Sequence, residues 1–453
     1  MTITRVFIPN RGEIALRIVR ACRALGVESV VGTSDVDRDG LAALSADRAV
    51  CLGPGPAPQS YLREDLVVQA ALGTGCDAIH PGYGFLSESP RLAALAGEHG
   101  LVFVGPPPDV IELAGDKLRA RSEAIRAGLP VLPGEEVSSL AQARELAERI
   151  GYPILVKAAG GGGGRGIKLA HDTDGLAELL GLARSEAAAA FGDGRVYLER
   201  FIAAARHIEV QIAADRHGSV ADLGDRDCSV QRRYQKLIEE APAPRLADST
   251  RTALSDAAVR YGRAIAYRNV GTVEFMVDAA SGDFYFLEIN CRIQVEHPVT
   301  EAVTGSDLVC EQLRIADGEP LRVTRPAAQP GGHAIECRLT AEDPAHGFRP
   351  SPGTISQFSV PALPGLRVDT HCHDGALVPP FYDSLLAKLI AHGANRSEAI
   401  EILLAALERL RVEGVPTNRE LLRRVLAHPS FAAGAVTTGW LEHTLPELQE
   451  APA

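Results

Sequence analysis

One run of sixteen residues, FLEINCRIQVEHPVTE from Phe286 to Glu301, constrains the fold of this chain most strongly. Polar and apolar side chains alternate along it, which is typical of a β-strand, because successive strand side chains point to opposite faces. A strand that only faces solvent rarely shows this order of acid, amide, base, amide and acid. The pattern predicts a strand with one chemically active face, made of Glu288, Asn290, Arg292, Gln294 and Glu296.

A further acid is expected beside this strand. Glu274 lies in the preceding apolar run, residues 271–277, which is predicted to pair with the strand as a hairpin neighbour. Carboxylate and amide oxygens are hard ligands of the kind that hold Mg²⁺. Glu274, Glu288 and Asn290 are therefore candidate metal ligands.

Composition limits the classes of partner. The 453 residues carry a formal net charge of −12, which argues against nucleic acid or an anionic membrane as a partner. Apolar runs stay well below membrane-spanning length, and the apolar core near residue 1 is too short for a signal peptide. The eight cysteines are scattered without a Cys-x-x-Cys pair, as reduced thiols are. We expect a cytoplasmic protein of several domains.

The first part of the chain has the rhythm of an α/β domain. Strands are expected at residues 6–8, 29–32 and 78–79, and helices at 12–25 and 109–127. The turn after the first strand lacks the G-x-G-x-x-G spacing of a dinucleotide site.

The turn HPGYGFLSE follows the strand at residues 78–79. Open α/β sheets bind ligands at the carboxyl ends of their strands. Tyr83 and Glu88 of this turn are therefore candidate site residues, and a plain tight turn is the alternative interpretation.

A glycine-rich loop indicates phosphate binding. Residues 160–166 read GGGGGRG between two apolar segments that resemble the strands of a hairpin. Glycine lets backbone N–H groups approach an anion, and Lys157 before the loop supplies a compensating charge. Only five of the 46 basic residues are lysine, so a lysine here indicates a need for a compact charge. The chain has no Walker A spacing, and we expect a loop that is mobile until nucleotide binds.

Over nearly its whole length the chain resembles the biotin carboxylases of the ATP-grasp superfamily. The matching segments, in chain order, are NRGEIALRI, HPGYGFLSE, GDK, KAAGGGGGRG, RHIEVQ, RDCSVQRRYQK, EINCRIQVEHPVTE, ECRLTAEDP and PFYDSLLAKLI. Each segment alone is moderately specific, and the whole set in this order is highly specific.

The resemblance implies an α/β fold, α+β in part, with a three-domain ATP-grasp architecture. We expect an N-terminal Rossmann-like α/β domain at residues 1–115 and a connector with a mobile ATP-grasp lid at 116–203. A central catalytic part at 204–330 and a C-terminal biotin carboxylase domain at 331–447 would follow.

The resemblance also implies the reaction: ATP, bicarbonate and biotin give ADP, phosphate and carboxybiotin by way of carboxyphosphate, with Mg²⁺ or Mn²⁺. This is the first half-reaction of an acetyl-CoA or other acyl-CoA carboxylase, as in fatty acid biosynthesis. The implied partners are a biotin carboxyl carrier protein, carboxyltransferase subunits and a second copy of the chain in a homodimer.

Site residues follow from the resemblance position by position. ATP would contact Lys117, Lys157, Gly162, Gly163, Gly164, Arg165, Gly166, Glu199, His207 and Gln231. The metals would bind Glu274, Glu288 and Asn290. Bicarbonate would lie among Lys236, Arg292, Gln294, Val295 and Glu296, with Glu296 as the base. Arg338 would stabilise the biotin enolate, and Tyr83 would pack near the biotin ring.

Biotin is expected to arrive in trans. In the family it is attached to a lysine between methionines, whereas the only methionines here are Met1 and Met276. Two other functions stay open at this point: a different ATP-grasp ligase, such as a carbamoyl-phosphate or purine-pathway enzyme, and a non-catalytic nucleotide-binding regulator. The second is disfavoured because every implied catalytic position is filled.

Overall fold

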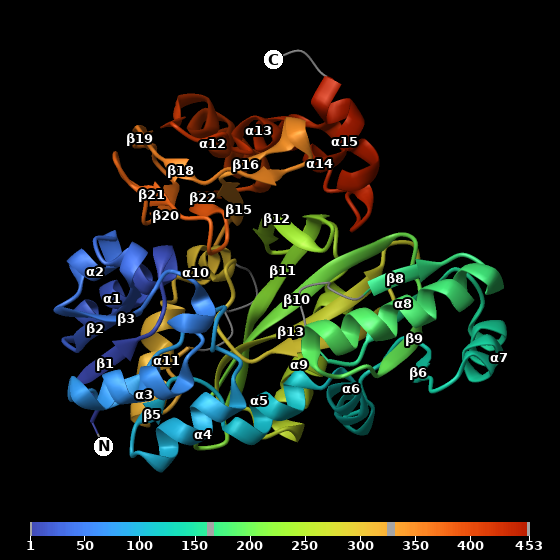
Figure 1. Cartoon of the computed structure of the whole chain (residues 1–453). Helices are drawn as coiled ribbons and strands as arrows, with labels where there is room; N and C mark the ends of the chain where they lie inside the picture. Colours follow the sequence, from blue (N-terminus) through green and yellow to red (C-terminus); the bar gives the residue numbers. More distant parts are fainter. Residues whose placement is uncertain (1, 161–166, 324–330, 451–453) are drawn as a thin grey trace.

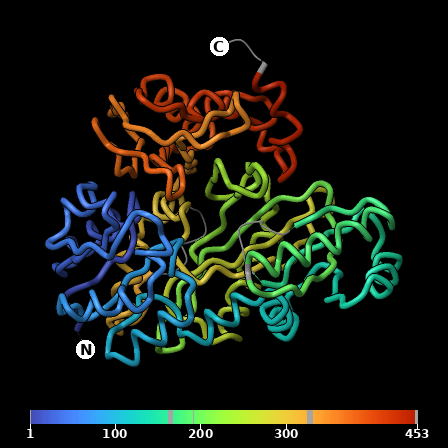
Figure 2. Tube along the Cα trace, viewed as in Figure 1, coloured from blue at the N-terminus to red at the C-terminus, as the bar shows by residue number. Residues whose placement is uncertain are grey.

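The computed structural model describes residues 2–160, 167–323 and 331–450. Six residues of the expected phosphate loop, Gly161, Gly162, Gly163, Gly164, Arg165 and Gly166, lie outside these ranges. Figure 1 shows an α/β part in blue, a green lid that projects to one side, and an orange and red C-terminal part above a central sheet. The trace in Figure 2 shows the first and last segments at opposite ends of the molecule.

The N-terminal part is built on a parallel sheet with strand order β3-β2-β1-β4-β5. The strands are β1 (Arg5–Ile8), β2 (Glu28–Ser34), β3 (Arg48–Gly53), β4 (Ala78–Ile79) and β5 (Val102–Phe103). The helices are α1 (Gly12–Leu25), α2 (Leu41–Ser45), α3 (Glu64–Gly73), α4 (Pro90–Glu98), α5 (Pro108–Gly115) and α6 (Lys117–Arg126). This arrangement confirms the predicted Rossmann-like α/β class.

Helix α1 has the bounds that its apolar spacing predicts. Its buried face includes Ile14, Ile18 and Cys22, which pack against the sheet core. Gly26 ends the helix in the left-handed conformation with φ 69°, which glycine adopts without strain.

The helix expected at residues 109–127 is wrong as a single element. Asp116 interrupts it, since its carboxylate accepts hydrogen bonds from the N–H groups of Leu118 and Arg119 and caps α6. The sequence signal was Gly115 followed by Asp116, a helix stop followed by an N-cap residue. The interruption puts Lys117 at the first residue of α6, where its N–H bonds to the Ala159 carbonyl.

The lid is a four-stranded antiparallel sheet in the order β6-β9-β7-β8. It comprises β6 (Gly134–Glu136), β7 (Ile154–Ala158), β8 (Ile167–Ala170) and β9 (Val196–Arg200), with α7 (Leu140–Ile150) and α8 (Thr173–Phe191) packed on it. Strands β7 and β8 pair antiparallel across the glycine-rich segment, which confirms the predicted hairpin.

The central sheet has eight antiparallel strands in the order β14-β13-β10-β11-β12-β15-β22-β20. They are β10 (Ala205–Ala214), β11 (Val220–Arg232), β12 (Gln235–Ala241), β13 (Asn269–Asp278), β14 (Phe284–Asn290), β15 (His333–Thr340), β20 (Leu366–Thr370) and β22 (Leu385–Gly393). Pairing of β12 with β15 joins the central and C-terminal regions into one sheet. Side chains far apart in the sequence can therefore share one face.

Helices cover this sheet and complete the C-terminal part. They are α9 (Asp248–Ala264), α10 (His297–Thr304), α11 (Leu308–Asp317), α12 (Arg396–Arg409), α13 (Arg419–Ala427), α14 (Pro429–Ala432) and α15 (Trp440–Glu450). Short pairs flank them: β16 (Glu342–Asp343) with β17 (Arg349–Pro350), β18 (Gly353–Thr354) with β21 (Leu377–Val378), and β19 (Gln357–Ser359) with β23 (Arg411–Glu413). The Asn395 side chain caps α12 by accepting from the Glu398 N–H, a role that asparagine commonly takes at the start of a helix.

The strand expected from Phe286 to Glu301 is wrong beyond Asn290. Strand β14 ends there, residues 291–296 form a bend and a turn, and α10 begins at His297. Pro298 at the second helical position favours a helix start, because its missing N–H is not needed there. Arg292, Gln294 and Glu296 therefore lie on a loop, which is called the 291–296 loop below.

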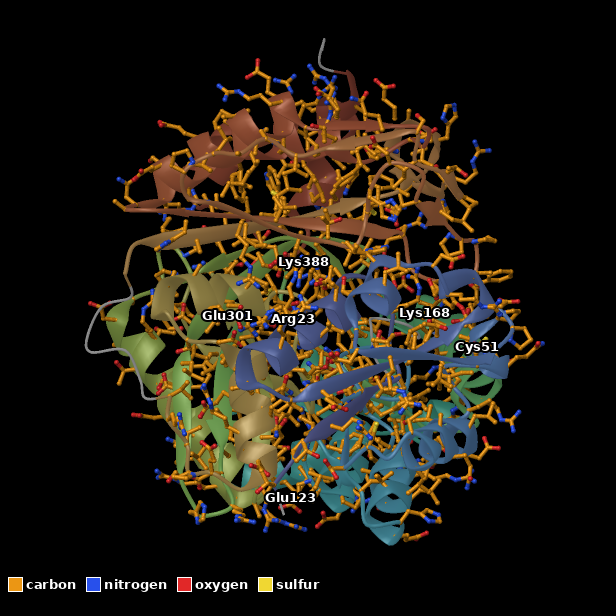
Figure 3. All side chains as sticks on the ribbon, turned by 90° about the vertical axis from the view of Figure 1, so that its left-hand side faces the viewer. Arg23, Cys51, Glu123, Lys168, Glu301 and Lys388 are labelled. Carbon is orange, nitrogen blue, oxygen red and sulfur yellow. The ribbon has the colours of Figure 1, made fainter. Side chains whose placement is uncertain are left out.

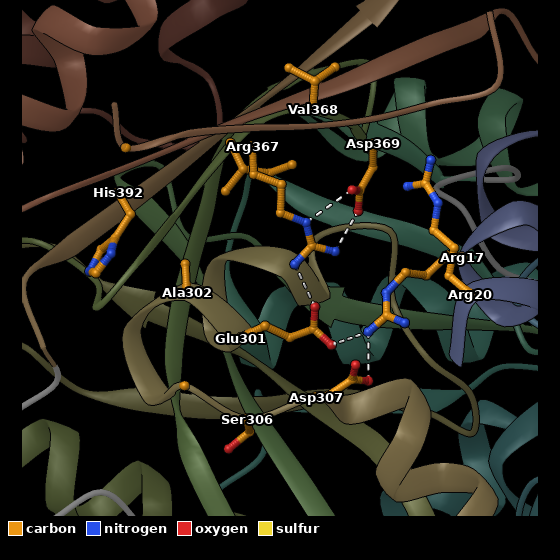
Figure 4. A pocket seen from close by; sticks show the side chains of 13 residues that line it. Arg17, Arg20, Glu301, Ala302, Ser306, Asp307, Arg367, Val368, Asp369 and His392 are labelled. Carbon is orange, nitrogen blue, oxygen red and sulfur yellow. Dashed lines mark hydrogen bonds and ion pairs between the residues drawn. The ribbon is translucent and has the colours of Figure 1, made fainter. Parts of the chain in front are cut away.

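An ion-pair network joins the N-terminal, central and C-terminal parts beside a pocket of about 490 Å³ (Figure 4). Arg17 of α1 contacts Glu301 at 2.9 Å and Asp307 at 2.6 Å, and Arg367 of β20 contacts the same Glu301 at 2.7 Å. One buried carboxylate thus links two guanidinium groups from opposite ends of the chain. In the part of the chain that the structure describes, every helix is too short or too polar to cross a membrane.

Candidate active site

Glu296 is the one acid of the 291–296 loop, and it has no exposed surface. One carboxylate oxygen accepts a hydrogen bond from Lys236 Nζ at 2.6 Å, and the other accepts one from the Arg338 guanidinium at 2.8 Å. Burial would raise the pKa of Glu296, but the charges of Lys236, Arg338 and Arg226 lower it well below its usual value. The carboxylate is therefore ionised at neutral pH.

Lys236, near the start of β12, connects three acids. Its Nζ donates to Glu209 at 2.6 Å, to Glu274 at 3.1 Å and to Glu296 at 2.6 Å. Burial would lower the pKa of Lys236, yet the surrounding acidic groups raise it well above its usual value. The ammonium therefore stays charged and holds carboxylates from separate segments around one point.

Glu274 of β13 lies at the centre of a set of donors. Its Oε1 accepts from Asn290 at 2.8 Å and from Gln294 at 3.1 Å, and its Oε2 lies 2.7 Å from His207 Nε2. Burial would raise the pKa of Glu274, and the cations Lys236 and His207 lower it. Asn290, Gln294 and His207 are thus connected to Lys236 through the Glu274 carboxylate.

The candidate metal ligands fit a hard divalent cation. Glu274 of β13 faces Glu288 of β14 in register, so both carboxylates stand on neighbouring strands as predicted. The Glu288 carboxylate is partly exposed, and its ion pair with Lys117 is long, at 3.9 Å. Oxygen donors of this kind, with one carboxylate only weakly held, match what Mg²⁺ or Mn²⁺ takes.

Arg292 does not share a strand face with Glu296, contrary to expectation. Its Nε donates to Glu88 at 3.0 Å, and its two terminal nitrogens donate to Gln294 at 2.8 Å and to Asn290 at 3.1 Å. The guanidinium that contacts Glu296 is instead that of Arg338 on β15, which also binds Glu239 at 2.6 Å. The loop bends after Asn290, and this bend turns Arg292 toward the HPGYGFLSE turn.

Two of the predicted nucleotide contacts lie in the lid. Lys157 of β7 is buried and pairs with the Glu199 carboxylate of β9, which also accepts from Arg121 at 3.4 Å. The Lys157 ammonium lies 6.0 Å from the centre of the Tyr197 ring. These groups stand at the end of β7 that leads into the glycine-rich segment.

Two other predicted nucleotide contacts lie on the central sheet. His207 of β10 contacts Glu274, a candidate metal ligand, and burial lowers its pKa while Glu274 raises it, with a net rise. Gln231 of β11 stands opposite Lys236 in the β11–β12 register. Both side chains are therefore adjacent to the Lys236 network.

Tyr83 reaches the site from the N-terminal part. Its hydroxyl donates to Glu13 of α1, and Glu13 pairs at 3.0 Å with Lys388 of β22. Lys388 in turn donates to the Val295 carbonyl of the 291–296 loop at 2.9 Å. Tyr83 also lines a pocket of about 130 Å³ with Phe85, Phe381 and others.

Sequence reasoning missed three residues that shape this site. Arg226 is fully buried on β11 and donates to Glu209 at 2.5 Å, and Glu239 of β12 binds Arg338. Glu209 stands within RHIEVQ and Arg226 begins RDCSVQRRYQK, so both lie in segments already singled out. The signal for Glu209 was an acid between Ile208 and Val210, because a charged residue in a buried strand requires a partner.

The geometry gives this site a definite chemical ability. Lys236, Arg338 and Arg292 are cations around an ionised acid, Glu296, and the carboxylates of Glu274 and Glu288 stand beside them. Such a site can bind a small anion, accept a proton from it, and hold a metal next to it. Phosphoryl transfer needs this combination of positioning and charge.

Comparison with protein families matches three family models in sequence order. The "Biotin carboxylase, N-terminal domain" matches residues 2–111, the "Carbamoyl-phosphate synthase L chain, ATP binding domain" matches 116–324, and the "Biotin carboxylase C-terminal domain" matches 336–443. Among curated proteins, "Biotin carboxylase" of Nostoc sp. is 48% identical over 444 residues, which cover 98% of this chain and 99% of that protein.

Solved structures agree with these matches. The biotin carboxylase domain dimer of Hydrogenobacter thermophilus 2-oxoglutarate carboxylase, in complex with MgADP, ADP and bicarbonate, has a TM-score of 0.96 and 42% identity, with 100% of each chain covered. The biotin carboxylase–beta-gamma-ATP complex from Campylobacter jejuni has a TM-score of 0.94 and 40% identity, with 97% of this chain and 99% of that chain covered.

Proposed function

The chain belongs to the biotin carboxylase family, and from this premise we propose that it carboxylates biotin with ATP and bicarbonate. The observation that carries the proposal is the ionised Glu296 between Lys236 and Arg338. An acid held this way can take the proton of bicarbonate while the two cations hold the anion. Biotin is the acceptor. We propose that a separate carrier presents it, because the family attaches biotin to a lysine between methionines and no lysine of this sequence has such neighbours.

We propose the following sequence of steps. Bicarbonate binds among Lys236, Arg292, Gln294, Val295 and Glu296. Its negative charge competes for the same cations, which raises the pKa of Glu296 and makes it a better base. Glu296 accepts the bicarbonate proton, and a bicarbonate oxygen attacks the γ-phosphorus of ATP, so that ADP leaves and carboxyphosphate forms.

Carboxyphosphate then breaks into carbon dioxide and phosphate, and the phosphate takes the N–H proton of the biotin ureido group. The ureido nitrogen attacks carbon dioxide to give carboxybiotin. Arg338 stabilises the negative charge on the ureido oxygen of the enolate. Its guanidinium lies 2.8 Å from Glu296, the proposed base, and therefore stands beside the bicarbonate site. Tyr83 packs near the ring.

We assign the nucleotide to Lys117, Lys157 and the glycine-rich loop, with Glu199, His207 and Gln231 toward the base and ribose. Glu274, Glu288 and Asn290 hold the divalent cation, which neutralises phosphate charge when bound. Two ion pairs support this assignment, since Lys117 pairs with Glu288, a proposed metal ligand, and Lys157 pairs with Glu199 in the lid. We propose that the chain divides into four parts, residues 1–115, 116–203, 204–330 and 331–447.

We further propose that the chain works in the cytoplasm as a homodimer with a carrier protein and carboxyltransferase subunits. The dimer in the Hydrogenobacter thermophilus structure supports the homodimer. All eight cysteines, each within the described residues, are free thiols, which supports a reducing compartment.

The experiment is ATP cleavage with the purified chain and Mg²⁺. We expect cleavage that depends on bicarbonate and rises when free biotin is added. A carbamoyl-phosphate or purine-pathway ligase would not respond to biotin, so ATP cleavage that free biotin leaves unchanged would contradict the proposal. A regulator without catalysis would bind ATP and leave it intact.

A further inference from the structure

Lys388 is the one completely buried lysine among the five. It lies on β22, between β15 and the edge strand β20 of the large sheet, and Figure 3 labels it where the C-terminal part meets the N-terminal part. A buried ammonium is costly unless acceptors surround it. Lys388 must therefore have acceptors around it that require a compact, charged donor.

Three segments supply the acceptors. Lys388 Nζ donates to the Val295 carbonyl at 2.9 Å, pairs with Glu13 of α1 at 3.0 Å, and lies 4.0 Å from Asp369 of β20. Burial would lower the pKa of Lys388, but Glu13, Glu336 and Asp369 raise it. The ammonium thus stays charged while it holds three separate parts of the chain.

Lys388 also stands directly opposite Arg338 in the β15–β22 register. Cross-strand partners share one face of a sheet, so the two cations point the same way. Arg338 binds the Glu296 carboxylate at 2.8 Å. The two cations therefore hold the same 291–296 loop. Arg338 binds a side chain of the loop, and Lys388 binds a backbone carbonyl of the loop.

The backbone contact is specific for Glu296. The Val295 carbonyl and the Glu296 N–H belong to one planar peptide unit, so a bond to that carbonyl fixes the orientation of the backbone that enters Glu296. The 291–296 loop has no strand ladder to fix it, since β14 ends at Asn290. The hydrogen bond from Lys388 to the Val295 carbonyl fixes the loop backbone instead.

We propose that Lys388 is a positioning residue, which holds the Val295–Glu296 peptide in the bicarbonate site and ties it to the Glu13–Tyr83 pair on the biotin side. The inference rests on the proposed function. Arginine would not serve, because its longer planar fork cannot place one short contact on a single carbonyl within this enclosed space.

The test is Lys388→Met, which keeps the apolar stem and removes the ammonium. We expect the bicarbonate KM in ATP cleavage to rise about 10- to 100-fold, because small misplacements of reacting groups have effects of this size. The Kd for ADP, measured by calorimetry, should stay within about twofold, since nucleotide contacts lie elsewhere. A purely structural lysine would lower stability and leave the bicarbonate KM unchanged.

Arg396→Met is the matched control. Arg396 of α12 also pairs with a buried acid, Glu240, at 2.6 Å, but it lies away from the 291–296 loop. This variant should lose stability and keep the wild-type bicarbonate KM. An equal rise of KM in both variants would overturn the inference.

Lys388→Arg covers the case in which Lys388→Met does not fold. It keeps the charge, and we expect a folded protein whose bicarbonate KM is still raised about fivefold or more. A wild-type KM in folded Lys388→Arg, or failure of both variants to fold, would overturn the positioning role. Absence of bicarbonate-dependent cleavage in the unmodified protein would instead contradict the proposed function itself, and this inference with it.

Discussion

Lys236 and Glu296 stand 60 positions apart in the sequence, and their side chains meet at 2.6 Å inside the protein. The ion pair joins β12 to the loop between β14 and α10. Because both groups are buried, each sets the charge state of the other: Lys236 lowers the pKa of Glu296, and Glu296 raises the pKa of Lys236. The proposed base is thus ready in its ionised form before any substrate binds.

Glu296→Gln keeps the shape of the side chain and removes its basicity. We expect carboxylation of free biotin to fall by roughly 10² to 10⁴, the usual contribution of general-base catalysis. ATP binding should change little, because Glu274 and Glu288 remain. Steady-state carboxylation and direct nucleotide-binding measurements check both points, and near-normal turnover would remove Glu296 from the role of base.

Arg292→Lys tests whether the bicarbonate site needs the planar guanidinium group of Arg292. The guanidinium uses separate nitrogens for Glu88, Gln294 and Asn290, and a single ammonium cannot reach all three acceptors. We expect kcat/KM for bicarbonate to fall about 10- to 100-fold. Arg63→Lys, at an exposed ion pair with Asp65, is the control and should behave as wild type. Equal kinetics in the two variants would count against Arg292 as a bicarbonate ligand.

Glu288→Gln tests the metal site. The carboxylate is only weakly held by Lys117 at 3.9 Å, so its loss should disturb the fold little. We expect the Mg²⁺ concentration for half-maximal ATP cleavage to rise about tenfold or more, since one charged ligand is lost. Glu136→Gln, an exposed acid on β6, serves as the comparison. An unchanged Mg²⁺ dependence would exclude Glu288 as a ligand.

His80 should make the protein sensitive to acid. Burial and the charge of Arg17 lower the pKa of His80 to about 3 in the folded chain, against an ordinary value near 6.5 in the unfolded chain. Between these values the unfolded chain binds the proton and the folded chain does not. The free energy of unfolding therefore falls as pH drops below about 6.5, with a loss of about 2 kcal/mol from this group at pH 5.

Chemical denaturation at pH 7 and pH 5 measures this loss. His80→Asn should reduce the difference between the two pH values, because the amide oxygen can accept from the Gly82 N–H as Nδ1 does at 3.1 Å. His346→Asn, at an exposed histidine, should keep the wild-type difference. Identical pH dependence in all three proteins would contradict the assignment.

Local patterns in the sequence determined much of the fold. The apolar spacing of α1, the short strand β4 and the hairpin that places Glu274 beside Glu288 were predicted correctly, since each depends on residues close in sequence. The same holds for the β7–β8 hairpin around the glycine-rich segment. The resemblance to the family added the fold class and the reaction.

Only the tertiary structure decided which groups meet at Glu296. Alternation along a strand predicted Arg292 as its neighbour, but β14 ends at Asn290 and the loop turns Arg292 toward Glu88. Arg338 and Lys236 reach Glu296 because β12 and β15 pair within one sheet, a register that no local pattern encodes. The burial of Arg226 and Lys388 has the same origin. A sequence specifies the side chains and their local periodicity, whereas long-range strand pairing decides which charges lose water and must find each other.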